Sequence, residues 1–382
     1  MHILENRMEV MLKKWCEVLT IVSGKNQKTV VSTDGRFPIY GSGGIIGYAS
    51  SYLCEAGTTI IGRKGTINKP IYVNQKFWNI DTAFGISPGK RLDSKYLYFF
   101  CCSFNFQALD KSTTIPSLSK KDLLQVQMPV PSLEEQKRIV AKIEERISTL
   151  DASVAELQTA KEKLKVYRQA VLKEAFDSVQ GNSKRVTIKS VCETIKVGIV
   201  IKPTQYYVEQ GGVFAFRNAN VRRNYIEDKD WVMISQEGHQ KNLKSQVHKG
   251  DVLIARSGVN LGMAAAVPQK YDGYNAIDVV IAVPKEEFIL PQYLAQYTNS
   301  PHGLEIVRKN QHGAAQGHLN VKEYGNLPIF LPNISKQYSL LEKIESRLSV
   351  CDSIEQAIDT SLQQADALRQ SILKQAFEGT LV

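Results

Sequence analysis

The sequence has little of what membrane-spanning and secreted proteins require. No apolar run is both long and uncharged, and the first residues lack the basic segment and apolar stretch of a secretory leader. We therefore expect a soluble protein of the cytoplasm. With 382 residues, the chain is long enough for two or three domains that each bury a core.

Cysteine and histidine are also scarce, with six of each. The cysteines form no Cys-x-x-Cys pair and stand at no zinc-type spacing from a histidine: Cys16, Cys54, Cys101, Cys102, Cys192 and Cys351. We interpret them as reduced thiols of an intracellular protein. His302, His312 and His318 follow one another at spacings of ten and six, which suit neither one helix face nor a known metal site. The sequence thus predicts no metal ion.

Motifs for catalysis are missing as well. The chain has no Asn-Pro-Pro-aromatic run of the kind with which adenine methyltransferases hold the target amine. Gly57 and Gly62 have the spacing of a P-loop start, but Arg63 and Lys64 follow where Lys and Ser or Thr are required. The glycine-rich stretch 41–47 lacks the Gly-x-Gly-x-x-Gly spacing, and we interpret it as a turn. The sequence therefore predicts no catalytic residues and no bound cofactor.

Acidic residues are outnumbered by basic ones. The chain has 48 lysines and arginines against 38 aspartates and glutamates, a formal net charge of +10 and a pI near 9.1. Such a balance favours a polyanionic partner, of which nucleic acid is the first candidate. Many soluble proteins are basic, so the charge supports this interpretation only together with other features.

What the sequence does contain is an internal repeat. Residues 118–178 return near the end of the chain without a gap, each position 201 residues later. The matches pair Leu118 with Leu319, Pro131 with Pro332, Gln136 with Gln337 and Phe176 with Phe377. A fixed offset of this kind is the signature of a tandem duplication.

Each copy continues from its proline into a long segment without glycine or proline. Apolar residues recur there at spacings of four and three: Ile143, Ile147, Leu150, Val154, Leu157, Leu164 and Val171, then Ile344, Leu348, Cys351, Ile358, Leu362, Ala365 and Ile372. Lys161, Arg168, Glu355 and Arg369 fill the gaps in this pattern. Heptads of this length predict two helices, each roughly 33 residues and about 50 Å long, that pair as a coiled coil. The alternative is an ordinary amphipathic surface helix.

The remaining sequence is β-type and punctuated by glycine. It predicts strands at 18–22, 29–33, 37–41, 58–65 and 70–74, then at 213–221, 249–262, 264–268 and 276–284, with helices at 93–109 and 291–298. We expect an N-terminal extension with a poor helical signal, two globular domains and two helical regions. Their ranges are 1–12 for the extension, 13–131 and 181–332 for the domains, and 132–180 and 333–382 for the helical regions.

The globular halves match each other more weakly than the helical segments do. Residues 57–65 (GTTIIGRKG) align with 250–258 (GDVLIARSG), which pairs Arg63 with Arg256. Trp15-Cys16-Glu17 aligns with Val191-Cys192-Glu193, and Tyr96-Leu97 with Tyr293-Leu294. A shared fold with divergent surfaces is typical of two modules that bind different ligands. Drift after duplication is the alternative.

These features together resemble the specificity subunit of type I restriction–modification enzymes. The resemblance covers residues 13–382 and is carried by the run PVPSLEEQKRI at 129–139, by YRQAVLKEAF and its partner LRQSILKQAF, and by the phrases GRKGTINKP and LIARSGVNLG. It implies an α+β chain. Two α/β target-recognition domains would be separated by two long helices that pair as an antiparallel coiled coil.

The same resemblance implies a function and a set of partners. The two domains would recognise two half-sites of a bipartite, asymmetric DNA target about one helical turn apart, with the helices as the ruler. The helices would also bind two methyltransferase (M) subunits, and restriction/translocase (R) subunits would join for cleavage. S-adenosylmethionine, ATP and magnesium would then belong to those partners.

Basic and amide side chains gather on turns at equivalent points of the two halves. The candidate DNA contacts are Arg63, Lys64, Asn68 and Lys69 in the first half and Arg217, Asn218, Asn220, Arg222, Arg223, Arg256, Ser257 and Asn260 in the second. Arginine pairs with guanine, asparagine pairs with adenine, and lysine more often neutralises phosphate. For any single residue the alternative is a solvated surface charge. The loops 113–117 and 311–317 are further candidates.

Three functions remain open on the sequence: a non-catalytic DNA-recognition subunit, an enzyme in its own right, and a structural coiled-coil protein without base recognition. The missing motifs count against the second, and the two unlike globular halves count against the third. A methylation assay on the purified chain alone separates the first from the second. Selection from a random pool of DNA separates the first from the third.

Overall fold

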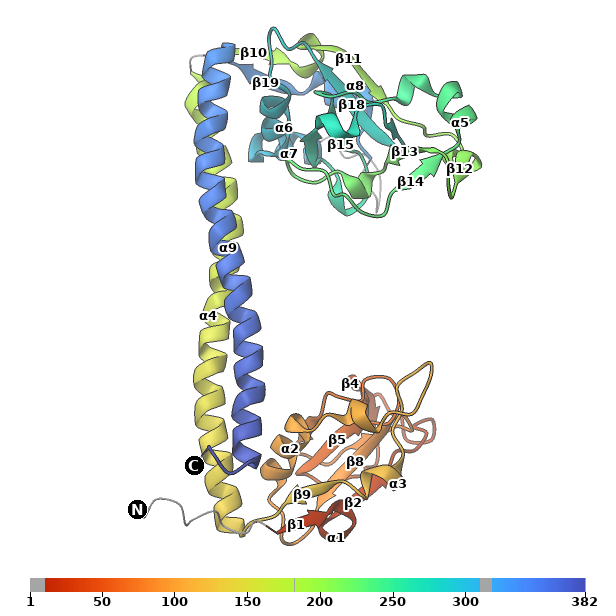
Figure 1. Ribbon diagram of the computed structural model, residues 1–382, viewed down its shortest axis with the longest axis vertical. Coiled ribbons are helices and arrows are strands. Elements are labelled where there is room, and N and C mark those ends of the chain that lie inside the picture. Colours follow the sequence, from red (N-terminus) through yellow and green to blue (C-terminus); the bar gives the residue numbers. More distant parts are fainter. Residues whose placement is uncertain (1–10, 182, 310–317, 382) are drawn as a thin grey trace. The chain divides into compact units, whose positions relative to one another are not determined.

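The computed structural model describes residues 11–181, 183–309 and 318–381 and divides into two compact units (Figure 1). Unit 1 combines Met1–Gln158 with Asp359–Val382, and unit 2 is Thr159–Ile358. Residues 1–10 of the expected N-terminal extension and the candidate loop 311–317 lie outside the described residues.

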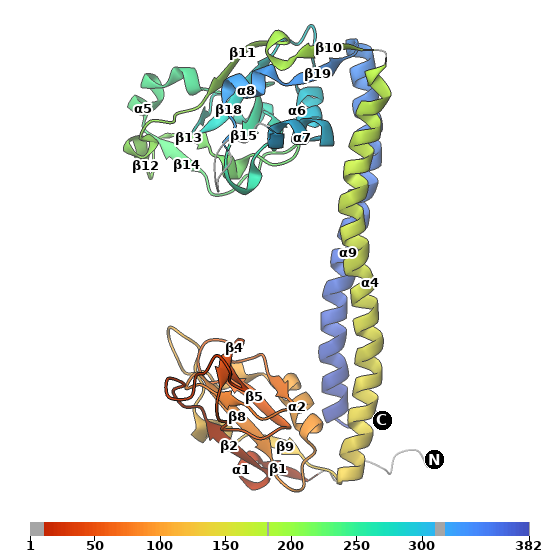
Figure 2. The ribbon, with the colours of Figure 1, turned by 180° about the vertical axis from the view of Figure 1, so that it is seen from behind.

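The main sheet of each unit has four antiparallel strands in equivalent order (Figure 2). In unit 1 the order is β2 (Leu19–Ser23), β8 (Ala83–Pro88), β5 (Thr58–Gly62) and β6 (Ile71–Val73). In unit 2 it is β11 (Cys192–Val197), β18 (Val279–Pro284), β15 (Val252–Ala255) and β16 (Ala264–Ala266). Thr59 lies opposite Ile86, and Val252 lies opposite Ala282, so β5 and β15 occupy the same place. The correspondence of Arg63 with Arg256 is therefore confirmed.

A second, smaller sheet completes each unit. In unit 1 it contains β4 (Gly44–Ala49), β3 (Phe37–Gly41) and β7 (Trp78–Asn79). In unit 2 it contains β12 (Tyr207–Val208), β14 (Val232–Ile234), β13 (Val213–Phe216) and β17 (Asn275–Ala276). The pairs β3–β7 and β13–β17 are parallel, whereas the other strand pairs of these sheets are antiparallel. The mixture of helix and sheet is as predicted, but α/β was the wrong class for the globular domains, because α/β domains are built on parallel sheets.

One predicted strand and one predicted alignment are wrong. Residues 29–33 form turns with an isolated bridge between Val31 and Ala49 instead of a strand. The Trp15 N–H donates to the Val126 carbonyl at 2.9 Å, and the Ile188 N–H donates to the Leu327 carbonyl at 2.9 Å. Because Val126 and Leu327 are repeat equivalents, Trp15 corresponds to Ile188, and the shared Cys-Glu letters misled the alignment by three residues. Pairing of β1 (Leu12–Lys14) with β9 (Gln127–Pro129), and of β10 (Lys184–Thr187) with β19 (Pro328–Leu331), sets the true register.

Corresponding helices of the two units, α2 (Ser94–Ser103) and α6 (Pro291–Asn299), pack against the main sheets. In unit 1, α2 packs on β5, β6 and β8, and the Asp93 carboxylate caps it by accepting from the N–H groups of Lys95 and Tyr96 at 2.9 Å. This helix ends before the predicted boundary at 109, and a short 3-10 turn (Phe106–Leu109) follows it. In unit 2, α6 packs on β15 and β16, in agreement with the predicted helix at 291–298. Further α-helices of the two units are α1 (Trp15–Val18), α3 (Lys120–Leu123), α5 (Gln236–Lys241), α7 (Pro301–Lys309) and α8 (Val321–Asn326).

A buried glutamine near the start of each long helix forms hydrogen bonds with the domain of the same unit. The Gln136 Oε1 accepts from the Asp93 N–H at 2.7 Å, and its Nε2 donates to the carbonyls of Arg91 at 3.0 Å and Pro131 at 2.8 Å. The same three bonds recur at Gln337, whose partners are Leu290 at 2.9 Å, Phe288 at 2.8 Å and Pro332 at 2.9 Å. Both glutamines are fully buried, so these bonds satisfy amide groups that water cannot reach.

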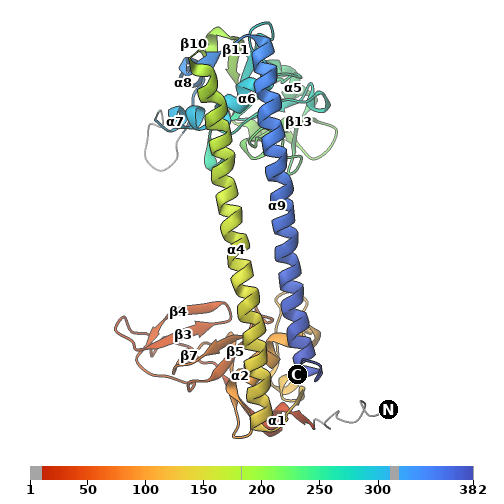
Figure 3. The same cartoon turned by 90° about the vertical axis from the view of Figure 1, so that its left-hand side faces the viewer.

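The long helices are α4 (Leu133–Gln180) and α9 (Ile334–Phe377), with 48 and 44 residues. All the predicted seam positions are buried or half-buried. In unit 2, where Figure 3 shows the two helical segments side by side, Arg168 pairs with Glu355 at 3.0 Å, and farther along α4 Glu174 pairs with Arg347 at 2.8 Å. Numbers rise along α4 as they fall along α9, so these two segments run antiparallel. The charged residues that interrupt the apolar seam therefore find partners on the facing helix, as Arg369 also does with Asp151 in unit 1.

In each unit, the C-terminal end of one long helix packs against the domain through a phenylalanine that recurs in the repeat. Near the end of α4, the Phe176 ring lies 5.4 Å from the Tyr293 ring and 5.2 Å from the Tyr297 ring in unit 2. At the end of α9, the Phe377 ring lies 5.1 Å from the Tyr96 ring and 5.3 Å from the Phe100 ring in unit 1. The same aromatic contact is thus made by two segments that are 201 residues apart.

We predict that Phe176→Ala loosens unit 2 and that Phe377→Ala loosens unit 1. Phe176 is fully buried, so its removal should cost about 3–5 kcal/mol, whereas the partly exposed Phe377 should cost less. Hydrogen exchange followed by mass spectrometry assigns the loss of protection to peptides of one unit or the other. Val166→Ala, at a position that is 71% exposed on α4, is the control. Loss of protection in the opposite unit would contradict the assignment.

Candidate nucleic-acid interface

A turn that begins with arginine follows β5 in unit 1 and β15 in unit 2. Its third residue is glycine at positive φ, +80° at Gly65 and +72° at Gly258, a conformation that side chains with a Cβ rarely adopt. The Leu118 N–H donates to the Arg63 carbonyl at 2.9 Å, and the Leu319 N–H donates to the Arg256 carbonyl at 2.9 Å. We call these segments the arginine turns: Arg63–Gly65 in unit 1 and Arg256–Gly258 in unit 2.

The arginine turn of unit 1 lies beside the candidate loop 113–117. The Gly65 N–H donates to the Pro116 carbonyl at 2.9 Å, and the backbone of Lys64 forms an isolated antiparallel β-bridge with Ser117. The Asp110 carboxylate holds this loop, since its Oδ1 accepts from the Ser112 N–H at 3.0 Å, the Ser112 hydroxyl at 2.6 Å and the Ser117 N–H at 3.0 Å. These bonds, the one from the Ser112 hydroxyl above all, lower the pKa of Asp110. The arginine turn of unit 1 and the loop 113–117, which are far apart in the sequence, thus form one surface.

The four candidate residues of unit 1 differ in exposure and in the contacts that their side chains make within the domain. The guanidinium of Arg63 lies 5.8 Å over the Phe84 ring, and its Nη1 donates to the Asp81 carbonyl at 3.3 Å. Lys64 and Lys69 are exposed. Asn68 is also exposed, but its Oδ1 accepts from the Phe106 N–H at 2.8 Å. The two lysines are therefore the side chains most available to a phosphate.

Asn218 is the centre of the cluster in unit 2. Its Oδ1 accepts from the Arg256 N–H at 2.8 Å, and its Nδ2 donates to the Ser257 hydroxyl at 2.9 Å and the Asp278 carbonyl at 3.0 Å. The Asn218 carbonyl in turn accepts from the Asn260 amide at 2.9 Å. One asparagine thereby joins the arginine turn of unit 2 to the end of β13.

Two candidates of unit 2, Asn220 and Asn260, are buried. Asn220 is 1% exposed, and its amide donates to the carbonyls of Glu227 and Lys229 at 3.2 and 2.8 Å. Asn260 is 5% exposed and donates to Asn218. Both amides therefore donate to backbone carbonyls inside the domain, and a base could reach either only if the turn opened.

The arginines of unit 2 are mostly turned toward their own domain. Arg256 has a side chain that is 14% exposed and lies 3.3 Å from the Asp278 carboxylate, while Arg222 lies 3.8 Å from Glu227. Arg217 donates to the Asp230 carbonyl. Among the described residues, the buried Nε atoms of Arg217 and Arg256 have no hydrogen-bond partner. Arg223 is exposed. The guanidinium groups of Arg217, Arg222 and Arg256 thus already lie beside acceptor oxygens of their own domain.

One element of this surface in unit 1, strand β4, was not predicted from the sequence. Residues 41–47 are the tip and second strand of the hairpin formed by β3 and β4. Ser42 at this tip approaches the arginine turn so closely that a Cβ on Gly62 would lie 3.1 Å from the Ser42 Cβ. Glycines between two β-type runs are a hairpin signal that could have predicted this element.

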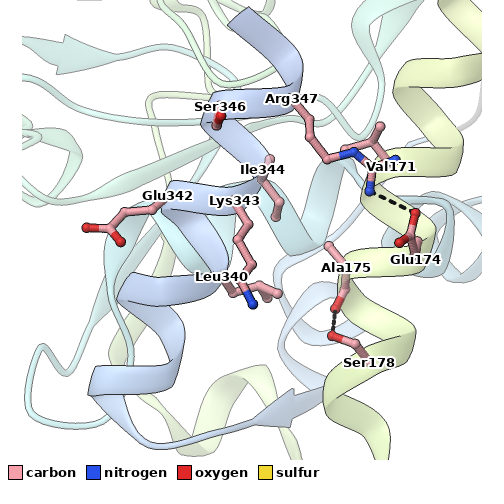
Figure 4. A pocket seen from close by; sticks show the side chains of 10 residues that line it. All are labelled: Val171, Glu174, Ala175, Ser178, Leu340, Glu342, Lys343, Ile344, Ser346 and Arg347. Atoms are coloured by element: carbon pink, nitrogen blue, oxygen red, sulfur yellow. Dashed lines mark hydrogen bonds and ion pairs between the residues drawn. The ribbon is translucent and has the colours of Figure 1, made fainter.

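A groove opens between α4 and α9 within unit 2 (Figure 4). Its volume is about 520 Å³, and its apolar lining comes from Val171, Leu340 and Ile344. The ion pair of Glu174 with Arg347 lies at its edge. Hydrogen bonding to Glu174 and Tyr167 raises the pKa of Arg347. An apolar lining beside charged side chains suits a protein partner better than a small polar ligand.

Comparison with known proteins finds similarity to one family of DNA-specificity proteins. Residues 8–165 match the family described as the type I restriction modification DNA specificity domain. The chain is a relative of type I restriction enzyme specificity subunits. It is 27% identical to the EcoBI specificity subunit of Escherichia coli over 350 residues, 84% of this chain and 73% of that one. It is 22% identical to the EcoKI specificity subunit of Escherichia coli strain K12 over 345 residues, with the same coverage.

Solved structures of such subunits share the fold. One, described in work on complex assembly and conformational transition of the type I R-M system, matches with a TM-score of 0.72 at 18% identity and covers 97% of this chain and 98% of its own. The HsdS subunit from Thermoanaerobacter tengcongensis matches with a TM-score of 0.53 at 18% identity and 97% coverage of both chains. Within the described parts of this specificity-subunit relative, no helix has the length and apolarity needed to cross a bilayer.

We predict that Asp110→Ala frees the loop beside the arginine turn of unit 1. Exchange of the Ser112 and Ser117 amides should become several-fold faster, while α2 stays protected. Since folding lowers the pKa of Asp110, its stabilisation is complete above the ordinary aspartate value of about 3.9 and is lost as the pH falls through the lower folded value. Amide exchange measured by NMR at several pH values checks both statements. Asp34→Ala is the control, and equal exchange in both variants would contradict this role.

Proposed function

We propose that this chain is the DNA sequence-specificity subunit of a type I restriction–modification complex, and that units 1 and 2 each recognise one half-site of a bipartite target. The observation that carries the proposal is the duplicated arginine turn. The same strand, the same left-handed glycine and the same hydrogen bond from Leu118 or Leu319 present a basic turn in both units. Kinship with specificity subunits and a net charge of +10 agree with DNA as the ligand.

The two half-sites should differ, which makes the target asymmetric. The two turns occupy equivalent places, but unit 1 presents exposed lysines beside loop 113–117, whereas unit 2 presents arginines organised around Asn218. Different donors in equivalent places select different base edges. Surviving candidates for contact are Arg63, Lys64, Asn68 and Lys69 in unit 1 and Arg217, Asn218, Arg222, Arg223, Arg256 and Ser257 in unit 2.

The long helices would set the distance between the half-sites. The buried seam and the charge pairs inside each unit favour pairing of α4 with α9 along their whole length as an antiparallel coiled coil. Such a rod would separate the half-sites by about one turn of DNA. The groove between α4 and α9 supports the helices as the docking place of methyltransferase subunits.

Catalysis would then lie with partner subunits in the cytoplasm. The chain has none of the methyltransferase or P-loop motifs that its length would accommodate. The two M subunits would supply S-adenosylmethionine chemistry, and the R subunits would supply the ATP- and magnesium-dependent cleavage. This chain would supply recognition and assembly.

Selection from random duplex DNA tests the function directly. The chain with its methyltransferase subunits should enrich two short blocks separated by a spacer of unselected sequence. The purified chain alone should neither methylate nor cut the enriched DNA. A single enriched block, or chemistry in a preparation free of partner subunits, would overturn the proposal.

We predict that Arg63→Ala and Arg256→Ala each weaken discrimination at one half-site and leave the other unchanged. Loss of a base contact should cost about 1–3 kcal/mol of specific binding. Binding of DNA with single substitutions in each block measures the effect. Lys229→Ala, with a side chain that is 76% exposed, is the control for a simple loss of charge. An equal loss on specific and random DNA would make the arginine a phosphate contact instead.

A further inference from the structure

The hairpin of unit 1 carries two isoleucines that its own fold does not use. Ile45 is 52% exposed and Ile46 is 56% exposed, although both belong to β4. Neighbouring residues of a regular strand point to opposite faces, so one of the two would ordinarily face the domain. Leaving two adjacent isoleucines in water forgoes the free energy that their burial would provide.

A β-bulge explains how both side chains are exposed. Ile39 lies opposite Gly47, and the next residue, Tyr40, lies opposite Ile45, so Ile46 is an extra residue with no partner on β3. A bulge breaks the alternation of the strand and redirects a side chain. β4 is the edge strand of its sheet. Among the described residues, the turn segment around Val31 bonds only to the far end of β4, at Tyr48, Ala49 and the following Ser50, and does not pair with Ile45 or Ile46.

The exposed pair lies beside the basic surface already described. A Cβ on Gly65 would lie 3.8 Å from the Ser42 hydroxyl, and a Cβ on Gly41 would lie 3.8 Å from the Ile46 side chain. The hairpin tip therefore adjoins the arginine turn that presents Lys64. Residues 35–54 contain no aspartate or glutamate, so this part of the chain adds no negative charge of its own against a phosphate backbone.

We propose that the β3–β4 hairpin enters the DNA major groove and that Ile45 and Ile46 contact the C5-methyl group of thymine in the half-site of unit 1. The major groove is wide enough for a two-stranded ribbon, and thymine is the base that presents a methyl group there. Lys64 and the neighbouring loop would then meet the flanking phosphates. This inference rests on the proposed function and extends it to the chemical group that one element recognises.

Unit 2 provides a contrast that strengthens the assignment. Ala215 and Phe216 of β13 pair with β17 as Ile39 and Tyr40 of β3 pair with β7. The chain then continues into Arg217 and Asn218, where unit 1 has Gly41 and Ser42. An apolar tip in one unit and a polar one in the other would select different bases at equivalent positions.

Replacing thymine by deoxyuridine tests the contact, because it removes the methyl group and keeps every hydrogen bond of the base pair. On the target found by selection, deoxyuridine in the first half-site should raise the Kd of the unaltered complex about fourfold for each contacted methyl. For the double variant Ile45→Ala, Ile46→Ala, the Kd on thymine DNA should already be raised. Deoxyuridine should then change it little further.

Two controls isolate the hairpin. Ile201→Ala, in unit 2 at a position that is 76% exposed, should keep the full response to deoxyuridine in the first half-site. Deoxyuridine in the second half-site should affect the unaltered complex and the hairpin variant equally. Since both isoleucines are exposed, the hairpin variant should show the unaltered melting temperature, which separates lost recognition from lost folding.

Three results would overturn the inference. They are a first half-site without thymine, an unaltered complex that does not respond to deoxyuridine, and a hairpin variant whose defect is a change in DNA bending, as for an apolar wedge in the minor groove. If bipartite recognition persists in these cases, the proposed function stands and the thymine contact alone fails. An unaltered complex that recognises neither half-site would instead contradict the proposed function itself.

Discussion

The position of each arginine turn depends on one buried amide. In unit 1, Gln136 at the start of α4 accepts from the Asp93 N–H, and the Asp93 carboxylate caps α2. Because α2 packs on β5, which leads into the arginine turn, a short chain of buried contacts connects the helix to the turn. Gln337 begins the corresponding chain in unit 2. Leaving these buried groups unpaired would cost about 1–3 kcal/mol each, which keeps the connection rigid.

The two units share the residues that hold the fold and differ in the residues at the surface. Residues that are the same in both units hold backbone: the two glutamines, the turn glycines, and Tyr96 with Tyr293, whose hydroxyls donate to the carbonyls of Pro129 and Phe330 at 3.1 and 2.7 Å. Apart from the shared Arg63 and Arg256, residues that differ are those at the surface of the arginine turns and at the end of β3 or β13. A change of base preference therefore requires no change in the buried bonds on which the fold depends.

Features encoded in local sequence were predictable, and features encoded in distant pairing were not. The long helices follow from their heptads, and β5 and β15 follow from apolar runs that end at a glycine turn. The equivalence of Trp15 with Ile188 depends on strand pairing across more than a hundred residues, which similar letters nearby obscured. Asn220 and Asn260 have the residue type of a base contact, but the fold buries them. The exposure of Ile45 and Ile46 results from a bulge in register that no local pattern indicates.

The contact of Phe377 with Tyr96 and Phe100 has a consequence for the order in which the chain is completed on the ribosome. Unit 2 is continuous, and all of it has been synthesised before Ile358 is passed. Unit 1 begins first but also needs Ile372, Leu373, Ala376 and Leu381 in its core. The earliest-made domain is therefore the last to close, and Tyr96 and Phe100 lack their contact with Phe377 while two hundred further residues are added. A truncated product of translation would contain a finished unit 2 and an unfinished unit 1.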